Sequence, residues 1–268
     1  MTTKIFPLSG PINLHARIGR GSLIVDAQDG LTEATVTITA RSKNAGVADR
    51  VDVAMAGPTL TVQAPREGGV FDLPFFGNRS RDAIDVLITV PSGTAVKIST
   101  FSADITVRGR VGGADIAAGA AEIGIEQVDG DLRLRYGSGS STVVRVTGSV
   151  QSRSGSGTAR FGEIDGDLSC GCGSGELEVR VVHGAVRSRS GSGSASLQSV
   201  FGDVDLASGS GQMSIGLPTG QPARLDVTTG SGRVNSELPI EDAPMSNQRP
   251  ITVRARTGSG NIRLFRAA

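Results

Sequence analysis

The chain has 268 residues, enough for one large domain or two small ones, and its 27 Lys and Arg nearly balance its 26 Asp and Glu. The resulting net charge of +1 excludes the broad basic field that holds nucleic acid or an anionic membrane surface. The 38 glycines are about twice the usual share of about 7%, and there is no tryptophan, so few bulky side chains are available for a thick core.

The first 90 residues predict β-structure. Apolar and polar residues alternate over six short runs that Gly, Pro, Asn and Asp separate: 12–18, 22–27, 34–40, 50–56, 59–64 and 83–90. These runs do not follow the repeat that dominates the later sequence. We therefore expect residues 1–90 to form an N-terminal β cap or small sandwich, and residues 91–268 to form a separate, repetitive region.

A loop with three of the eight phenylalanines interrupts this first region. In "GGVFDLPFFGNRSRD", residues 68–82, the sequence places Phe71, Phe75 and Phe76 between glycines and charged residues. Two readings stay open. The rings plug the open end of the repetitive region as buried apolar groups, or they are exposed and contact a partner. These three residues are the candidate partner-contact site.

From Gly112 onward the sequence repeats with a constant period. One glycine series keeps the same spacing without interruption, and a second series opens a Gly-Ser-Gly in all but its first member. The first series is Gly112, Gly130, Gly148, Gly166, Gly184, Gly202 and Gly220, and the second is Gly119, Gly137, Gly155, Gly173, Gly191 and Gly209. A fixed period, here 18, over this many units is typical of a stacked repeat architecture.

Each repeat predicts strand, Gly-Ser-Gly turn, strand and glycine turn. Counting from the opening glycine, positions 2, 13 and 16 are apolar, as Leu168, Val179 and Val182 illustrate, and the positions between them are polar. One such unit cannot bury its apolar face alone, whereas stacked units can, with strands about 4.8 Å apart. We therefore predict an all-β fold: a single-stranded β-solenoid, similar to a β-helix, with 18-residue coils, glycines of positive φ at its corners, and a ladder of the Gly-Ser-Gly serines.

The C-terminal end keeps the motif with insertions. "TTGSG" at residues 228–232 and "RTGSG" at 256–260 repeat the turn, and five of the eleven prolines lie between 218 and 250. Since proline cannot donate to a β-ladder, we expect a cap that blocks edge-to-edge growth, with residues 241–250 as a loop between the last two strands.

Polar residues of the repeat offer three candidate sites. Cys170 and Cys172 suggest a redox or metal pair, but a buried cysteine is also a small filler for a narrow interior, and we expect both to be reduced and dispensable. Asp-Gly-Asp at 129–131 and 165–167 would stack at one corner and could bind calcium or act as acid and base, although aspartate is also an ordinary turn residue. The two histidines, His15 and His183, show no metal or triad spacing.

An arginine-rich face is the third candidate. It either is a solvated surface or binds an anionic glycan or lipid headgroup; it comprises Arg133, Arg135, Arg153, Arg187 and Arg189. Weighing these patterns, the sequence predicts no catalytic, cofactor-binding or metal site, and no cofactor. Residues 1–26 lack a basic stretch followed by an apolar one, and no apolar run approaches the roughly 18 residues of a membrane span. We expect a cytoplasmic location, with recruitment to the membrane by a partner as a further option.

The sequence resembles the bacterial Toastrack family of β-strand-repeat proteins, which carry the label "putative adhesin". The resemblance covers nearly the whole chain and rests on "FPLSGPINLHARIGRGSLIVDA", on "DVLITVPSGTAVKISTFSADITV", and on the Gly-Ser-Gly coils that end in "TGSGNIRLF". It implies an all-β, non-enzymatic protein that accompanies envelope-stress systems, and it carries over no catalytic residues.

The functional prediction is therefore a non-enzymatic scaffold or interaction module that binds a protein partner or another copy of itself, linked to bacterial envelope homeostasis or stress. Two alternatives are a filament-forming structural protein similar to bactofilins and a carbohydrate-active β-helix enzyme. The enzyme would need a groove lined by acidic and aromatic residues, whereas the coils show mostly Ser, Gly and Arg.

Overall fold

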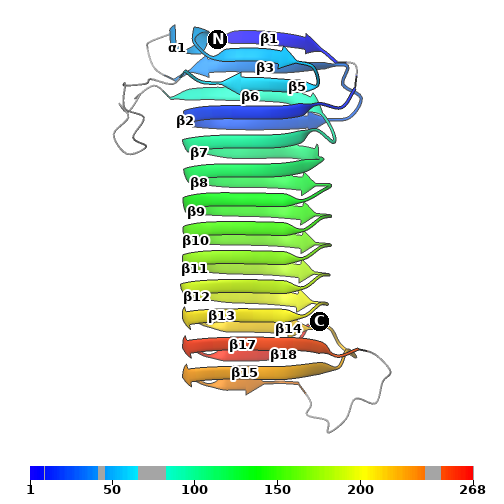
Figure 1. Ribbon diagram of the computed structural model, residues 1–268, viewed down its shortest axis with the longest axis vertical. Coiled ribbons are helices and arrows are strands. Elements are labelled where there is room, and N and C mark those ends of the chain that lie inside the picture. The colour runs from blue at the N-terminus through cyan, green and yellow to red at the C-terminus, as the bar shows by residue number, and fades with distance from the viewer. Residues whose placement is uncertain (9, 42–45, 66–82, 239–248, 268) are drawn as a thin grey trace. The chain divides into compact units, whose positions relative to one another are not determined.

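The computed structural model describes residues 1–8, 10–41, 46–65, 83–238 and 249–267. The chain forms two compact units, Met1–Asp129 and Gly130–Ala268. Within the described ranges every element is a β-strand except the four-residue helix α1 (Gly46–Asp49), which is far too short to cross a membrane (Figure 1). The predicted all-β fold is confirmed.

The first unit is built around one long, bent strand. Its strands are β1 (Thr2–Pro7), β2 (Asn13–Gln28), β3 (Glu33–Ala40), β4 (Asp52–Ala56), β5 (Thr59–Gln63), β6 (Ile84–Pro91), β7 (Ala95–Val111) and β8 (Gly113–Val128). Strand β2 pairs in parallel with β7 on one side and with β5 and β6 on the other, and β7 pairs in parallel with β8. Antiparallel pairing adds β3 to β6, β1 to β3 and β4 to β5.

This pairing changes the interpretation of the N-terminal segment. The two predicted runs 12–18 and 22–27 are one strand, and Asn13 to Ala27 align with Ala95 to Gly109 of β7 as a complete coil. The expectation that the segment stands outside the repeat is therefore wrong for β2. Strands β3 to β6 lie between β2 and β7 in the sequence and hide the period. The predicted domain boundary between residues 90 and 91 stays a prediction.

The second unit is a stack of coils in parallel register. Its strands are β9 (Leu132–Val146), β10 (Val150–Ile164), β11 (Leu168–Val182), β12 (Val186–Val200), β13 (Val204–Ser210), β14 (Met213–Leu217), β15 (Ala223–Ser231), β16 (Val234–Ser236), β17 (Ile251–Ser259) and β18 (Ile262–Arg266). From β9 to β12 the ladder partners are one period apart in the sequence, as Val150 and Leu168 show, and this solenoid-like stacking confirms the predicted register.

The stacking order differs from the chain order at the C-terminal end. Strands β17 and β18, the last in the sequence, pair with β13 and β14, and β15 and β16 then pair with the outer side of β17 and β18 (Figure 1). The two TGSG motifs are thus neighbours in the stack, but in reversed order. Most of the predicted loop at 241–250 lies outside the described residues.

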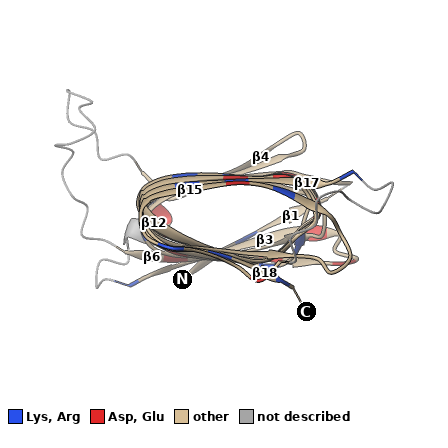
Figure 2. Ribbon diagram, turned by 90° about the horizontal axis from the view of Figure 1, so that it is seen from below, with Lys and Arg blue, Asp and Glu red and all other residues tan. Residues whose placement is uncertain are grey.

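Each coil of the second unit folds back on itself into two layers. The first half of a coil lies in one layer, with β13, β17 and β15, and the second half lies in the other, with β14, β18 and β16 (Figure 2). The chain bends at Gly-Ser-Gly without leaving the ladder, so β9 to β12 are each one 15-residue strand and not the two predicted. Ser156, Ser174, Ser192 and Ser210 align as the predicted serine ladder.

The core lies between the two layers. The predicted inward positions are buried: position 13 at Val143, Phe161, Val179, Leu197 and Ile215, and position 16 at Val146, Ile164, Val182 and Val200. The arginines between these positions point to solvent. Within each half of a coil the alternation follows from the period of two in a β-strand. Between positions 13 and 16 the period is broken once, because two successive residues, such as Arg180 and Val181, lie outside the buried set.

The glycines are required by close stacking more than by backbone conformation. Of the two repeating glycine series, only Gly220 has a positive φ, so the expected positive φ at the corners is wrong for the others described. A Cβ at Gly166 or Gly202 would instead lie 2.6 or 2.3 Å from the carbonyl oxygen of the coil before it. Positive φ does occur at the second glycine of the motif, as at Gly157.

Candidate functional site

Polar side chains gather at one corner of the second unit, where β10 and β11 end. Ile164 and Val182 point into the core at position 16, so positions 15 and 17 on either side of them point outward. Because adjacent coils are one period apart, Asp165 and His183 occupy the same position in neighbouring coils, and Glu163 lies just before Asp165 on the same outward face. The fold thus brings together three side chains that come from two coils.

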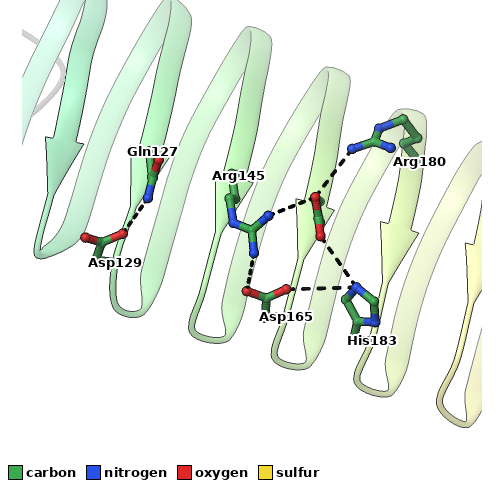
Figure 3. Close-up of polar contacts among 7 residues, drawn as sticks. Gln127, Asp129, Arg145, Asp165, Arg180 and His183 are labelled. Atoms are coloured by element: carbon green, nitrogen blue, oxygen red, sulfur yellow. Dashed lines mark hydrogen bonds and ion pairs between the residues drawn. The ribbon is translucent and has the colours of Figure 1, made fainter.

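Two arginines flank this cluster (Figure 3). Arg145, at the end of β9, places one guanidinium nitrogen 3.0 Å from Glu163 Oε2 and the other 2.9 Å from Asp165 Oδ2. Arg180 lies 3.6 Å from the same Oε2 atom. Two carboxylates therefore face two guanidinium groups, and the cluster is close to neutral before His183 is counted.

His183 completes the corner from the β11 side. Its Nε2 atom lies 3.5 Å from Glu163 Oε1 and 3.9 Å from Asp165 Oδ1. These are the carboxylate oxygens that do not contact Arg145. The imidazole stacks on Phe201 of the next coil, with ring centroids 5.0 Å apart and an interplanar angle of 22°. We name Glu163, Asp165 and His183 the corner triad. It combines carboxylate and imidazole donors on an accessible surface.

The two aspartates of an Asp-Gly-Asp motif have different roles. Asp131 Oδ1 accepts a hydrogen bond from the backbone N–H of Ser149 at 2.8 Å, and Asp167 Oδ1 accepts one from Ala185 at 2.8 Å. The second aspartate of each motif thus caps the next coil. The first one, Asp165 in the second motif, faces outward into the corner triad. Asp131 and Asp167 hold the same position two coils apart, as the period predicts, but each accepts a backbone N–H, so the two carboxylates do not face each other as a pair.

The two cysteines lie in the interior columns. Cys170 is buried and Cys172 partly buried, and both are free thiols. Burial raises the pKa of the Cys170 thiol to about 12, and burial also raises the pKa of Cys172. Their ladder neighbours are serines, Ser152 and Ser188 beside Cys170. A thiol that resists ionisation is a poor nucleophile and a poor metal ligand, which favours the filler interpretation.

The arginine-rich face lies on the first layer of the second unit. Arg135 and Arg153 are direct ladder partners, and Gly171 separates them from Arg189. Arg189 is paired with Asp205 at 3.0 Å. Further along, Ala207 lies between two longer side chains, Arg189 and Arg256, and the hollow there has a volume of about 520 Å³. This surface is shallow and basic, and it presents guanidinium groups to solvent.

The structure locates some of the residues predicted from the sequence and not others. Phe71, Phe75 and Phe76 lie outside the described residues, so the partner-contact site stays a prediction. The corner triad was missed, since His183 has no conventional motif around it. The signal was the repeat itself, because Asp165 and His183 are one period apart.

The stacked parallel coils, with interior columns of small and apolar residues, define a β-solenoid protein. A model of the family described as Toastrack DUF4097 matches residues 23–267, so the chain belongs to the Toastrack family. A comparison with curated proteins found no match.

Solved structures align with most of the chain at low identity. A "putative adhesin" from Parabacteroides merdae ATCC 43184 is 14% identical, with 98% of this chain and 95% of that chain covered and a TM-score of 0.56. Another from Bacteroides fragilis NCTC 9343 is 13% identical, with coverage of 98% and 96% and a TM-score of 0.44. A "putative lipid binding protein" from Parabacteroides distasonis ATCC 8503 is 13% identical, with coverage of 99% and 97% and a TM-score of 0.42. The first of these supports the fold.

Proposed function

We propose that this chain is a non-enzymatic scaffold that binds a protein partner or another copy of itself and serves bacterial envelope homeostasis or stress. This proposal rests on one observation: side chains that could be reactive are buried inside the coil stack or are hydrogen-bonded to its backbone. The Cys170 thiol is buried, and Asp131 and Asp167 accept backbone N–H groups. What the second unit offers to solvent is mainly regular strand faces, which suit recognition more than catalysis.

The arginine-rich face is the proposed contact surface. Arg133, Arg153 and Arg187 are exposed on this face, and guanidinium groups suit carboxylate partners. A partner with acidic side chains would complement their charge. On the second layer, Arg160 already pairs with Glu178 at 2.9 Å, so this arginine is a poorer candidate for an acidic partner.

Site-specific photo-crosslinking in the native bacterium tests this proposal. A crosslinking side chain at Gln151, on the arginine-rich face, should capture a discrete adduct. The same group at Thr142, an exposed residue of the second layer, is the matched control and should capture much less. Replacing Arg153 with Glu should remove the Gln151 adduct, because the charge that attracts an acidic partner is then reversed.

Two results would contradict the scaffold proposal. One is equal crosslinking at Gln151 and Thr142 with no effect of Arg153→Glu, which indicates random collisions. The other is turnover of an oligosaccharide by the purified chain, which would revive the carbohydrate-active alternative.

We also propose a cytoplasmic location with recruitment to the membrane by the partner. Free cysteines at 170 and 172 are typical of a reducing compartment. Cell fractionation of the native bacterium tests this location, and recovery in the periplasmic or medium fraction would overturn it.

Self-association into filaments is the second candidate function, and one observation favours it. Leu225 of β15 and Val234 of β16 are 41% and 47% exposed. Among the described strands, β15 and β16 are the outermost, and each of these strands pairs along one side only. An unpaired edge with apolar side chains is a template for further stacking. Negative-stain microscopy should show filaments that Leu225→Glu abolishes, and a monodisperse parent would remove this candidate.

A further inference from the structure

The corner triad directs one donor atom from each residue toward a common point. His183 Nε2 is 3.5 Å from Glu163 Oε1 and 3.9 Å from Asp165 Oδ1, and the three donors all lie within 4.8 Å of one another. A point equidistant from atoms with these separations is at most about 2.4 Å from each, close to the bond lengths of about 2.0–2.2 Å in zinc sites. Small side-chain rotations would close the difference.

The carboxylates are already oriented for such a site. Arg145 binds the far oxygen of both, Oε2 of Glu163 and Oδ2 of Asp165, so the near oxygens remain directed toward His183 (Figure 3). Hydrogen bonds to the outer oxygen of a ligating carboxylate are a common feature of metal sites, where they fix the ligand and tune its affinity. The ion pairs therefore act as support for the inner donor atoms.

The imidazole is held in place in a comparable way. Stacking on Phe201 restrains the ring, and the distances from Nε2 to the two carboxylates exceed the usual 2.7–3.2 Å of a hydrogen bond. Within the described residues, the Nε2 atom thus faces two anionic oxygens without bonding closely to either. A cation between the three donors would bring each of them to bonding distance.

We propose that Glu163, Asp165 and His183 bind a divalent first-row transition-metal ion of the Zn²⁺ type. One imidazole nitrogen and two carboxylate oxygens suit such ions, whereas calcium and magnesium prefer all-oxygen sites. The three ligands leave at least one position open to water or to a side chain of a partner. Because Glu163 and Asp165 belong to one coil and His183 to the next, the ion links two coils at their corner.

The chain is well suited to a direct test because it has only two histidines. Zn²⁺ titrated into the metal-free full-length protein should bind with one ion per chain by calorimetry. In NMR spectra of the imidazole nitrogens, the signals of His183 should move and those of His15, an exposed residue of β2, should not. Binding should also raise the Tm.

Variants assign the site. His183→Ala and Asp165→Asn should each weaken Zn²⁺ binding at least about tenfold, since loss of even a supporting group costs about 10–100-fold. His15→Ala is the matched control and should bind as the parent does. Circular dichroism spectra that match the parent verify that each variant is folded; because all the replaced side chains are partly or fully exposed, we expect this.

Three outcomes would overturn the proposal. The first is no saturable binding up to about 1 mM Zn²⁺, which corresponds to a free energy weaker than about −4 kcal/mol. The second is unchanged binding in His183→Ala. The third is loss of binding in the Cys170→Ser, Cys172→Ser double variant with His183 intact, which would assign the metal to the thiols.

Discussion

Replacing Gly157 with alanine should destabilise the coil stack strongly. Gly157 has a φ of +121°, and a Cβ there would lie 1.8 Å from the carbonyl oxygen of Gly139 in the coil before it. Real Cβ atoms essentially never approach closer than 3.0 Å, so the coils must separate by about 1.2 Å at this point, enough to break a ladder hydrogen bond. The neighbouring atom is backbone and cannot rotate away.

The magnitude follows from two costs. An unfavourable φ costs about 1–3 kcal/mol, and overpacking a tight contact costs about 1–3 kcal/mol. Together they predict a loss of about 2–6 kcal/mol in the free energy of unfolding. For a chain of this size that lowers the Tm by at least about 4 °C. Thermal unfolding followed by circular dichroism measures the change, and hydrogen exchange should show the fastest new exchange in β9, β10 and β11.

Gly171 provides the matched control for this substitution. It lies on β11 with no positive φ, and a Cβ there would meet nothing within 4 Å. Gly171→Ala should leave stability unchanged or raise it by about 0.4–1 kcal/mol, because alanine restricts the unfolded chain. If Gly157→Ala and Gly171→Ala melt at the same temperature, close stacking is not what requires glycine in this column.

Three further predictions concern the core, the thiols and the corner caps. Val179→Asp should cost several kcal/mol, because position 13 lies between Phe161 and Leu197 of adjacent coils; a melt like that of the parent would contradict its inward orientation. Burial raises the pKa of Cys170 from 9.0 to about 12, so the folded chain keeps a proton that the unfolded chain loses above about pH 9. Stability should therefore be complete below about pH 9 and fall by about 1.4 kcal/mol per pH unit up to about pH 12; urea titrations of the parent should show this slope, and those of Cys170→Ala should show less of it. Asp131→Ala and Asp167→Ala should each cost about 1 kcal/mol through loss of the bond to Ser149 or Ala185, and the double variant about twice that, because two ladder spacings separate the caps; a clearly non-additive double variant would indicate a coupled network.

The sequence predicts the fold of the regular coils well because one number, the period of 18, determines both the partners and the burial. Val150 pairs with Leu168, and the apolar positions 2, 13 and 16 point inward as expected. The prediction is weaker where segments interrupt the period. Strand β2 pairs with β7 so that Asn13 lies opposite Ala95, with four other strands between them in the sequence, and no local periodicity reveals this partner.

The reversed order at the C-terminal end could not be predicted from the motifs. Both β15 and β17 carry a Thr-Gly-Ser turn, so this motif alone does not decide which of them pairs with β13. Burial distinguishes them only in the folded chain: Val253 and Ala255 of β17 are enclosed on both sides, whereas Leu225 of the outer β15 is 41% exposed. Packing in the folded chain, and not the sequence pattern of β15 or β17, therefore decides which of these strands pairs with β13.

Surface chemistry follows the same period, and this is why the corner triad escapes a search for local motifs. In a parallel ladder the nearest outward neighbour of a residue is one full period away, so Arg145 meets Glu163 and Asp165 meets His183. Many charges are balanced in this way along their columns, which is the structural counterpart of a net charge of only +1. The informative place is therefore position 17, where the column changes from Asp165 to His183 and then to Phe201 and does not repeat a pair of opposite charges. A cation that supplies coordination bonds at this position gains interactions of the kind that the balanced columns already make within the chain.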